Sequence, residues 1–266
     1  MPIALTAFIE GVGLLGPGLT DWASSQAILS GQQPYQAQNA VIPAPVLLPA
    51  AERRRCGDLV KLTLATSLEA IAAAQLDAAS LASVFSSSHG DGHNCHTICE
   101  MLASDDRQLS PTRFHNSVHN AAAGYWSIAT GAMATSSVLC AFDASFGAGL
   151  LEALTQVVVD DTRCVLMASD TDYPEPVYSV RPLPDVLGIA LVLAPQRSPQ
   201  TIAQITVAIT YDAADQLDDV ALEALRLAIP AARGLPLLRA IAQQKATRVV
   251  LDYLDSTRLA VAVSAC

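Results

Sequence analysis

One stretch of the chain limits the folds open to it more than any other. Residues 136–142 are mostly apolar and are bounded by small residues, which is typical of a fully buried β-strand. Over 147–158, leucines and valines recur at helical spacing, which predicts a helix. One tight turn, 143–146, joins the two segments. A buried strand that turns sharply into a helix predicts a layered α/β unit.

The residue at this turn lies beside the unpaired backbone N–H groups of the helix start, a position suited to a nucleophile or an anion. Asp143 occupies it. One interpretation is an acyl hydrolase or acyltransferase that uses Ser145, with His119 or His89 as its base. Against it, Asp143 stands two residues before Ser145, where such a crowded turn ordinarily requires glycine. Another is that Asp143 acts as a general base, since burial or helix N–H groups can shift the pKa of its carboxyl in either direction.

Three segments of the sequence carry a resemblance to a known family. They are FIEGVGLLGPGL near the start, ERRR before a helix, and SVHNAAAGYWSI followed by FDASFGAGLLEA. Over about residues 5–195 the chain resembles the β-ketoacyl synthases of the thiolase-like fold, and most of all the short chain-length-factor subunits of aryl polyene and polyketide biosynthesis. In that family the strand delivers a cysteine to the helix start, and Asp143 stands in its place. No histidine follows His119, where a complete ketosynthase would have two catalytic ones.

The resemblance implies a fold and a function. The fold is α/β, thiolase-like and layered, with a shortened second half. Residues 1–266 are expected to form a single ketosynthase-like domain, with 1–195 as its N-terminal half and 196–266 as an abbreviated C-terminal half. Because condensation needs a thiolate and imidazoles, the expected function is a non-catalytic subunit. It would pair as a heterodimer with an active β-ketoacyl-acyl-carrier-protein synthase and shape its acyl tunnel, with no cofactor.

The resemblance also implies where the tunnel and the subunit interface lie. The helix over 116–129 would lie beside the tunnel, and the strand over 136–142 would pair across the two-fold axis of the dimer. Aromatic side chains on this helix also fit an ordinary core. The residues expected at the tunnel or interface are His119, Tyr125, Trp126, Met133, Cys140, Phe142, Asp143 and Phe146.

Three consecutive arginines, Arg53, Arg54 and Arg55, precede a helix predicted over 58–75. In the first turn of that helix they would oppose its dipole. They are the expected docking site for an acidic acyl carrier protein, which would reach the chain through the ketosynthase complex. A solvated, charged helix end is the alternative.

Charge and hydropathy exclude some functions. The chain has a net charge of −10 and no basic stripe, so nucleic acid is not expected as a partner. Hydrophobic residues make up 52% and charged residues 15%, which suggests that some surface is hidden in an oligomer. No secretory signal and no apolar run long enough to span a bilayer are recognised, so a cytoplasmic location is expected.

Two further sequence patterns suggest a binding site, and each also has a purely structural explanation. The glycine-rich stretch 11–18 suggests a dinucleotide-binding loop, but proline and glycine oppose the helix that such a loop must open, so turns after a strand over 4–9 are predicted. Histidines and cysteines also crowd together at His89, His93, Cys95, His96 and Cys99. They suggest zinc, but the paired C-x-x-C units of closed structural sites are missing, so no metal is expected.

The remaining pattern alternates strands and helices. Helices are expected over 22–29, 58–75, 97–102 and 116–129, with one or two more over 220–244 broken at Pro230. Strands are expected over 82–87, 164–169, 187–193 and 202–210, with a hairpin over 249–264 and loops over 30–49 and 173–186.

Overall fold

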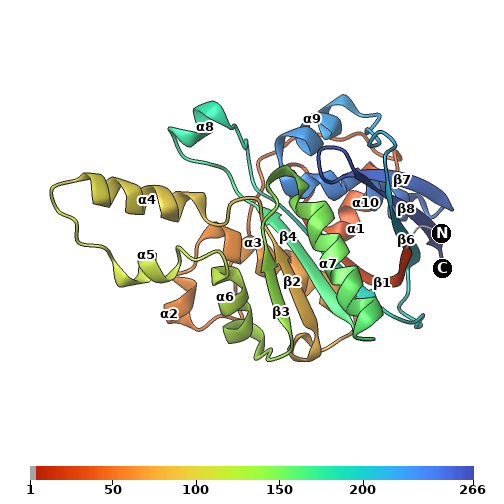
Figure 1. Cartoon of the computed structure of the whole chain (residues 1–266), viewed down its shortest axis with the longest axis horizontal. Coiled ribbons are helices and arrows are strands. Elements are labelled where there is room, and N and C mark those ends of the chain that lie inside the picture. The colour runs from red at the N-terminus through yellow and green to blue at the C-terminus, as the bar shows by residue number, and fades with distance from the viewer. Residues whose placement is uncertain (1–3) are drawn as a thin grey trace.

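One mixed sheet of eight strands runs through the molecule (Figure 1). The computed structural model describes residues 4–266; the first three residues, part of the segment in which no secretory signal was recognised, lie outside it. The strand order is β3-β2-β4-β5-β1-β6-β8-β7. The strands are β1 (Ala4–Leu15), β2 (Ala82–Ser86), β3 (Ser136–Leu139), β4 (Cys164–Asp170), β5 (Leu187–Ala194), β6 (Ala203–Thr210), β7 (Thr247–Asp252) and β8 (Arg258–Ala265).

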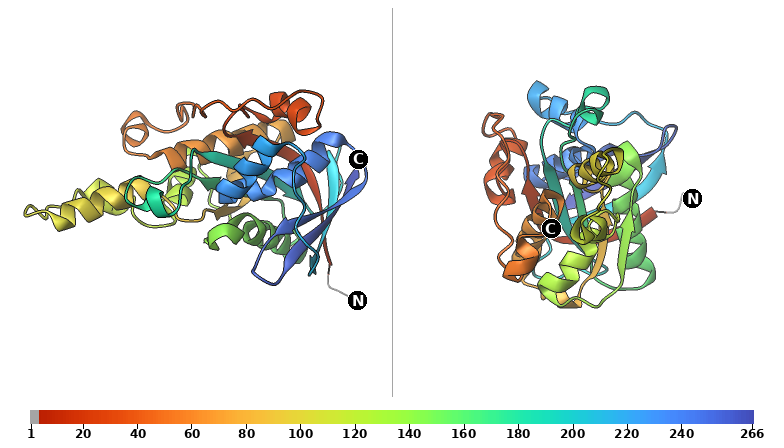
Figure 2. Two further views of the ribbon diagram at one scale, coloured as in Figure 1. Left: turned by 90° about the horizontal axis from the view of Figure 1, so that it is seen from above. Right: turned by 90° about the vertical axis from the view of Figure 1, so that its left-hand side faces the viewer.

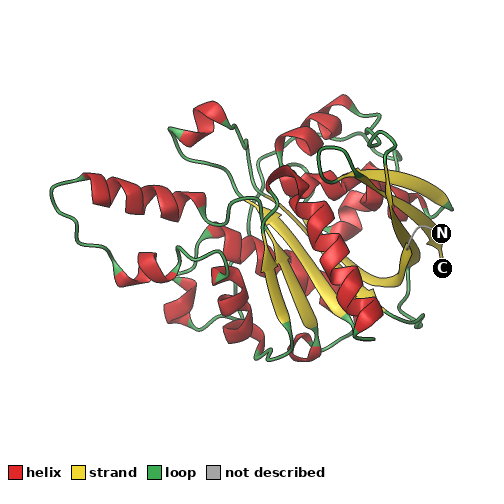
Figure 3. Cartoon of the chain, in the orientation of Figure 1, coloured by secondary structure: helices red, strands yellow, loops and turns green. Residues whose placement is uncertain are grey.

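Helices lie on both faces of this sheet (Figure 3). They are α1 (Trp22–Leu29), α2 (Ala50–Arg53), α3 (Asp58–Ala74), α4 (Gly92–Ala103), α5 (Pro111–His115), α6 (Ala121–Thr130), α7 (Ser145–Val159), α8 (Val177–Val180), α9 (Val220–Ala228) and α10 (Leu235–Gln243). Residues 4–266 also contain three short 3-10 helices: η1 (Ala78–Ser80), η2 (Phe142–Ala144) and η3 (Pro230–Gly234).

The sheet is parallel at one end and antiparallel over the rest. β3, β2 and β4 run parallel, whereas the other neighbouring pairs are antiparallel. The strands after residue 196, namely β6, β8 and β7, extend the same sheet beyond β1. The short second part of the chain therefore completes the sheet rather than forming a sheet of its own.

Alternating side chains divide the core between the two faces. Along β4, Val165 and Met167 belong to the apolar cluster under α3 and α6. Cys164, Leu166 and Ala168 belong to the cluster that contains the apolar residues of α7 and α10. This period of two is what a strand buried on both faces requires.

The glycine-rich stretch is part of a strand. β1 continues to Leu15, so the prediction of a strand that ends at residue 9 is wrong. The reason is a close approach of α3 to the backbone of β1. A Cβ atom added to Gly11 would lie 2.0 Å from the carbonyl oxygen of Ala70, and one added to Gly13 would lie 1.9 Å from that of Thr66. These glycines let a helix pack directly on a strand.

Most of the other predicted elements are confirmed. α1 has the predicted bounds, the helical segment over 220–244 breaks at Pro230, and β7 and β8 form the hairpin. The helix predicted over 97–102 begins earlier, at Gly92, because Asp91 caps it by accepting a hydrogen bond from the Asn94 N–H at 2.9 Å. The helix predicted over 116–129 is α6 alone, preceded by the separate α5. The loop predicted over 173–186 contains the short α8.

One segment of residues 4–266 is long and apolar enough, by length and composition, to cross a membrane. It is Phe142–Val159, with a mean hydropathy of 1.2, so the expectation of no such run is wrong. The segment is 56% buried, and α7 within it packs against β2 and β4. Leu150 and Leu154 are fully buried there. Packing against the sheet accounts for the apolar character of this helix.

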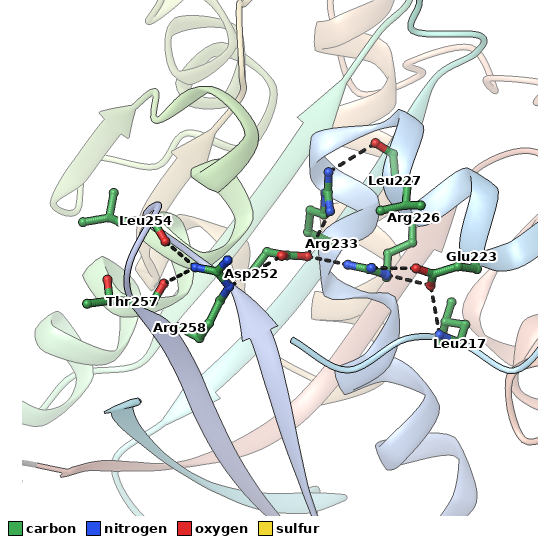
Figure 4. Close-up of polar contacts among 9 residues, drawn as sticks. All are labelled: Leu217, Glu223, Arg226, Leu227, Arg233, Asp252, Leu254, Thr257 and Arg258. Carbon is green, nitrogen blue, oxygen red and sulfur yellow. Dashed lines mark hydrogen bonds and ion pairs between the residues drawn. The ribbon is translucent and has the colours of Figure 1, made fainter. Parts of the chain in front are cut away.

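An arginine network ties the elements of the second part together (Figure 4). Arg226 of α9 is buried and contacts Glu223 and Asp252. Arg233 donates to the same Asp252 carboxylate at 3.0 Å, and Arg258 lies 3.9 Å from it. A single carboxylate at the end of β7 thus joins α9, η3 and β8.

An ion pair between a buried carboxylate and a partly exposed arginine fixes β1 to the turn before β4. Glu10 is only 2% exposed, and Arg163 donates to its two carboxylate oxygens at 2.8 and 3.2 Å. Burial by itself would raise the pKa of Glu10, but the hydrogen bonds from Arg163 and Ser198 and the charge of Arg163 outweigh it and lower the pKa. The pair therefore favours the folded state above about pH 4.5 and loses that effect as pH falls through the lowered pKa.

Arg163→Met is expected to lower the free energy of unfolding by about 2 kcal/mol at pH 7, because the Glu10 carboxylate stays buried without its cation. The difference from the native chain should shrink toward about pH 4, where the unpaired carboxyl takes up a proton. Urea unfolding of both chains at the two pH values measures this. A loss of the same size at both values would contradict the assigned role of Glu10.

Candidate functional site

The carboxyl ends of the parallel strands gather the chemistry-bearing residues of the sequence. β3 ends at Leu139 rather than at residue 142, and α7 begins at Ser145, so the turn between them is longer than predicted. Phe142 in this turn has a φ of 52°, a left-handed conformation that is strained for a large side chain. β3 is also only partly buried, contrary to the prediction, because it is the outer strand of the sheet.

Asp143 lies on the first turn after β3 with its side chain about half exposed. Its Oδ1 accepts a hydrogen bond from Arg181 Nη2 at 2.7 Å. The Arg181 guanidinium also lies 3.4 Å from the centre of the Phe142 ring, which adds a cation–π contact. Arg181 follows α8 in the loop after β4 and is the residue at this site that sequence reasoning missed. Since it lies 38 residues along the chain and in no motif, no local signal pointed to it.

Ser145 is buried and its hydroxyl bridges the turn. Ser145 Oγ donates to the Phe142 carbonyl at 2.7 Å and accepts from the Ala141 N–H at 3.0 Å. The Ser145 carbonyl accepts from Ser86 Oγ at 2.6 Å. Within residues 4–266, no histidine is hydrogen-bonded to Ser145. This arrangement stabilises the turn and does not activate the hydroxyl as a nucleophile.

His89 follows β2 and takes part in a buried polar network. Its Nδ1 lies 2.8 Å from Ser88 Oγ and 3.8 Å from the Asp170 carboxylate, and its ring packs on Tyr173 with 4.0 Å between centroids. Burial lowers the pKa of His89, opposed by the Asp170 charge, so the ring is favoured as neutral. Asp170 also accepts from the Ala231 N–H at 2.8 Å, which ties η3 to this edge of the sheet.

The residues expected at the tunnel or interface fall into two groups. Tyr125, Trp126 and Phe146 are buried core residues. Tyr125 donates to Asn116 Oδ1 at 3.1 Å, and Trp126 packs edge-on to Phe85 with 6.4 Å between ring centroids. The exposed group is Met133, Cys140, Phe142 and Asp143, all on the segments next to β3.

His119 belongs to neither group, because its side chain is half-buried. It lines two cavities of about 10 Å³ each, which is room for about one water molecule. Its Nε2 is buried and has no hydrogen-bond partner within residues 4–266.

Sequence comparison decides the family. The profile of the β-ketoacyl synthase N-terminal domain matches residues 22–252, most of the chain. The chain belongs to the β-ketoacyl synthase N-terminal domain family. No match was found among curated protein sequences.

Solved structures of ketosynthases share the fold of this β-ketoacyl synthase family member. One is a chain from the complex of a ketosynthase with its chain length factor from Xenorhabdus doucetiae, with 20% identity, a TM-score of 0.74, and coverage of 97% of this chain and 99% of that one. Another is a chain from a type II polyketide synthase acyl carrier protein in complex with its ketosynthase, with 11% identity, a TM-score of 0.79, and coverage of 99% and 100%. A third is a β-ketoacyl synthase from Burkholderia phymatum, with 10% identity, a TM-score of 0.70 and full coverage of both chains.

These comparisons confirm the predicted thiolase-like fold with a shortened second half. A ketosynthase from the bacillaene synthase of Bacillus amyloliquefaciens is matched over 80% of this chain but only 46% of its own length, at a TM-score of 0.57. This β-ketoacyl synthase family member is therefore shorter than that solved chain, at somewhat more than half its length.

The three arginines of this family member lie at the surface. Arg53 ends α2, and Arg54 and Arg55 follow it in the turn before α3, so they are not in the first turn of α3 as predicted. Arg54 and Arg55 line an open pocket of about 630 Å³, and Arg113 of α5 also lines it. The pocket also carries Asp58 and Asp91, so its charge is mixed.

Four residues of the histidine and cysteine cluster lie along α4, and the fifth, His89, precedes this helix. His93 Nε2 lies 3.0 Å from Asp172, and His96 Nε2 lies 3.3 Å from Glu100. Cys95 and Cys99 are exposed on the same helix. In the described part of the chain, no group of three potential ligands is placed to hold a metal ion.

Proposed function

We propose that the chain is a non-catalytic chain-length-factor subunit that forms a heterodimer with an active β-ketoacyl-acyl-carrier-protein synthase. Together they would build aryl polyene or polyketide-type chains in the cytoplasm, and residues 1–266 would act as one unit. The observation that carries the proposal is the turn after β3, where Asp143 is held by Arg181. Acyl transfer to a ketosynthase needs a thiolate at this turn, and a carboxylate in an ion pair does not supply one.

The two edges of the sheet differ in a way that supports pairing through β3. The outer edge of β7 is covered at its middle, where the Val250 N–H donates to the Asp215 carboxylate and the Val250 carbonyl accepts from the Asp215 N–H, each at 2.9 Å. Asp215 lies in the loop between β6 and α9. Among residues 4–266, the backbone of β3 pairs with β2 alone. An uncovered edge strand invites pairing with another chain. Met133 and Phe142, which flank β3, are 91% and 59% exposed and add apolar surface to this edge.

The exposed arginines support a contact with an acyl carrier protein in that complex. The chain as a whole is acidic, so the exposed cluster of Arg53, Arg54 and Arg55 is positive surface that suits an acidic partner, although Arg55 also pairs with Glu52 at 3.0 Å. Arg113, which also lines this pocket, adds a fourth positive charge. Structures of related proteins contain a ketosynthase with its chain length factor or with an acyl carrier protein, which agrees with these two partners.

Co-expression with the ketosynthase of the same organism tests the proposal. Size-exclusion chromatography and native mass spectrometry should give a one-to-one complex, and this complex should condense malonyl units. Asp143→Asn in the complex is expected to leave the condensation rate within about twofold of the native rate, because Asp143 does not stabilise the transition state in the proposed role.

One result would contradict the proposal: a chain that elutes as a homodimer and hydrolyses or transfers acyl groups without a partner. Loss of that activity in a Ser145→Ala chain that still folds would then support Ser145 as the nucleophile.

A further inference from the structure

An open pocket at one end of the molecule contains no residue of the turn after β3. α4 and α5 extend away from the sheet at this end, where α2 also lies (Figures 1 and 2). The volume of the pocket, about 630 Å³, is in the range of small-molecule sites. Arg54, Arg55 and Arg113 line it, so we name it the arginine pocket. Most of its other lining residues are polar as well.

The acidic side chains of the arginine pocket are engaged by neighbouring groups. Asp58 accepts a hydrogen bond from Lys61 Nζ at 2.7 Å. Asp91 accepts from the Asn94 N–H at 2.9 Å and lies at the start of α4, where the helix dipole favours a negative charge. These two carboxylates therefore offset Lys61 and the helix end rather than the arginines of the pocket.

Two of the three arginines have no carboxylate partner. Arg55 pairs with Glu52 at 3.0 Å. Arg54 lies in the turn before α3 and Arg113 lies in α5, and within residues 4–266 no ion pair involves either guanidinium group. Since the chain has a net charge of −10, two unpaired guanidinium groups make this pocket a local position that attracts an anion.

Two buried asparagines fix the backbone that carries these arginines. Asn94 and Asn116 are 7% and 8% exposed, and both line the pocket. Asn94 Nδ2 donates to the Arg113 carbonyl at 2.8 Å. Asn116 Nδ2 donates to the Arg55 carbonyl, also at 2.8 Å, and its Oδ1 accepts from the Tyr125 hydroxyl at 3.1 Å. The walls of the pocket are therefore set before a ligand enters, which lowers the cost of binding.

One further donor lines the pocket without a partner. Thr171 follows β4 and is only 3% exposed. Within residues 4–266 its hydroxyl makes no hydrogen bond. A largely buried hydroxyl is unfavourable in this condition, unless a ligand or a water molecule takes up the bond.

We propose that the arginine pocket binds the phosphate group of a small organic molecule, held between Arg54 and Arg113. A phosphate ester carries close to two negative charges at neutral pH and has three free oxygens. One guanidinium group satisfies a carboxylate, whereas two match the charge of a phosphate. The pocket is larger than a phosphate ion, so it has room for the organic part of the ligand. This inference goes beyond the proposed contact with a carrier protein, because its ligand must be small enough to enter the pocket.

Two matched pairs of ligands test the inference on the full chain. Adenosine monophosphate and adenosine differ only in the phosphate, and so do phosphopantetheine and pantetheine. In isothermal titration calorimetry, the phosphorylated member of at least one pair should bind about tenfold more tightly than the other member. The pair that shows the difference tells whether the phosphate belongs to a nucleotide or to a pantetheine-type group. If the phosphate makes no difference in either pair, or if no ligand binds, the inference is wrong.

Arginine variants test where the phosphate lies. Arg54→Met and Arg113→Met should each weaken binding of the phosphorylated ligand by about tenfold, because each removes a charged donor. Arg107→Met is the matched control, since Arg107 is exposed between α4 and α5 and does not line the pocket. It should change the dissociation constant by no more than about twofold, because a distant exposed charge is screened. An equal loss in all three variants would show an effect of overall charge and would overturn the inference.

The measurement does not depend on the proposed pairing, because it uses the chain without a ketosynthase. A chain that binds a phosphorylated ligand but pairs with no ketosynthase contradicts the proposed function and supports this inference. A chain that pairs with a ketosynthase but shows no phosphate-dependent binding overturns this inference and leaves the proposed function standing.

Discussion

Gly13→Ala is expected to lower the free energy of unfolding by at least about 3 kcal/mol, because the added methyl group has no space. Its Cβ would lie 1.9 Å from the Thr66 carbonyl oxygen and 2.8 Å from the carbonyl carbon. These are backbone atoms of α3, so no side-chain rotation can relieve the overlap, and the helix must move away from β1. Urea or thermal unfolding of the purified chain measures the effect. In the most severe case no folded protein is obtained.

The matched control is a glycine-to-alanine substitution at a position where the added methyl group has room. Gly124 lies in α6, and a Cβ atom added there meets no atom within 4 Å. Gly124→Ala should therefore raise stability by up to about 1 kcal/mol, as alanine favours a helix over glycine. If Gly13→Ala unfolds at the same urea concentration as the native chain, the close packing of α3 on β1 is wrong.

The second large effect is expected from the arginine network of Figure 4. Asp252→Ala removes the carboxylate shared by Arg226 and Arg233 and leaves the buried Arg226 with Glu223 alone. Breaking a buried ion pair at one partner typically costs about 3 kcal/mol, since the remaining charge stays desolvated. For a chain of this size the loss corresponds to a fall of roughly 5 to 10 °C in Tm.

An exposed ion pair provides the comparison for Asp252. Asp212 pairs with Arg248, and both side chains are more than half exposed. Asp212→Ala should leave Tm unchanged, because an ion pair in water contributes little. A Tm for Asp252→Ala that equals that of Asp212→Ala would show that the network does not hold β7 and β8 to α9.

Local patterns predicted the elements well because they depend on near neighbours in the sequence. Apolar spacing identified α1, α3 and α7 and the buried strands β2, β4 and β5, usually to within a residue or two. The limits of α4 were missed because its start is set by a side-chain cap at Asp91 rather than by apolar spacing. The resemblance likewise placed Asp143 at the turn between strand and helix.

Predictions that depended on burial were less accurate, because burial is decided by neighbours from elsewhere in the chain. The strand before the turn was expected to be fully buried from its apolar sequence, but β3 lies at the edge of the sheet. The glycines of β1 were interpreted as turn residues, although they allow contact with α3, more than 50 residues away along the chain.

The sequence by itself determined the order of strands and helices, the family and the presence of a carboxylate at the turn. Only the tertiary structure showed that Arg181 holds Asp143, that the Ser145 hydroxyl is engaged by the backbone of its own turn, and that Arg54 and Arg113 line one pocket. Periodicity and motifs report interactions within a few residues. Ion pairs, strand order and pockets depend on how distant segments meet, and no local pattern records that.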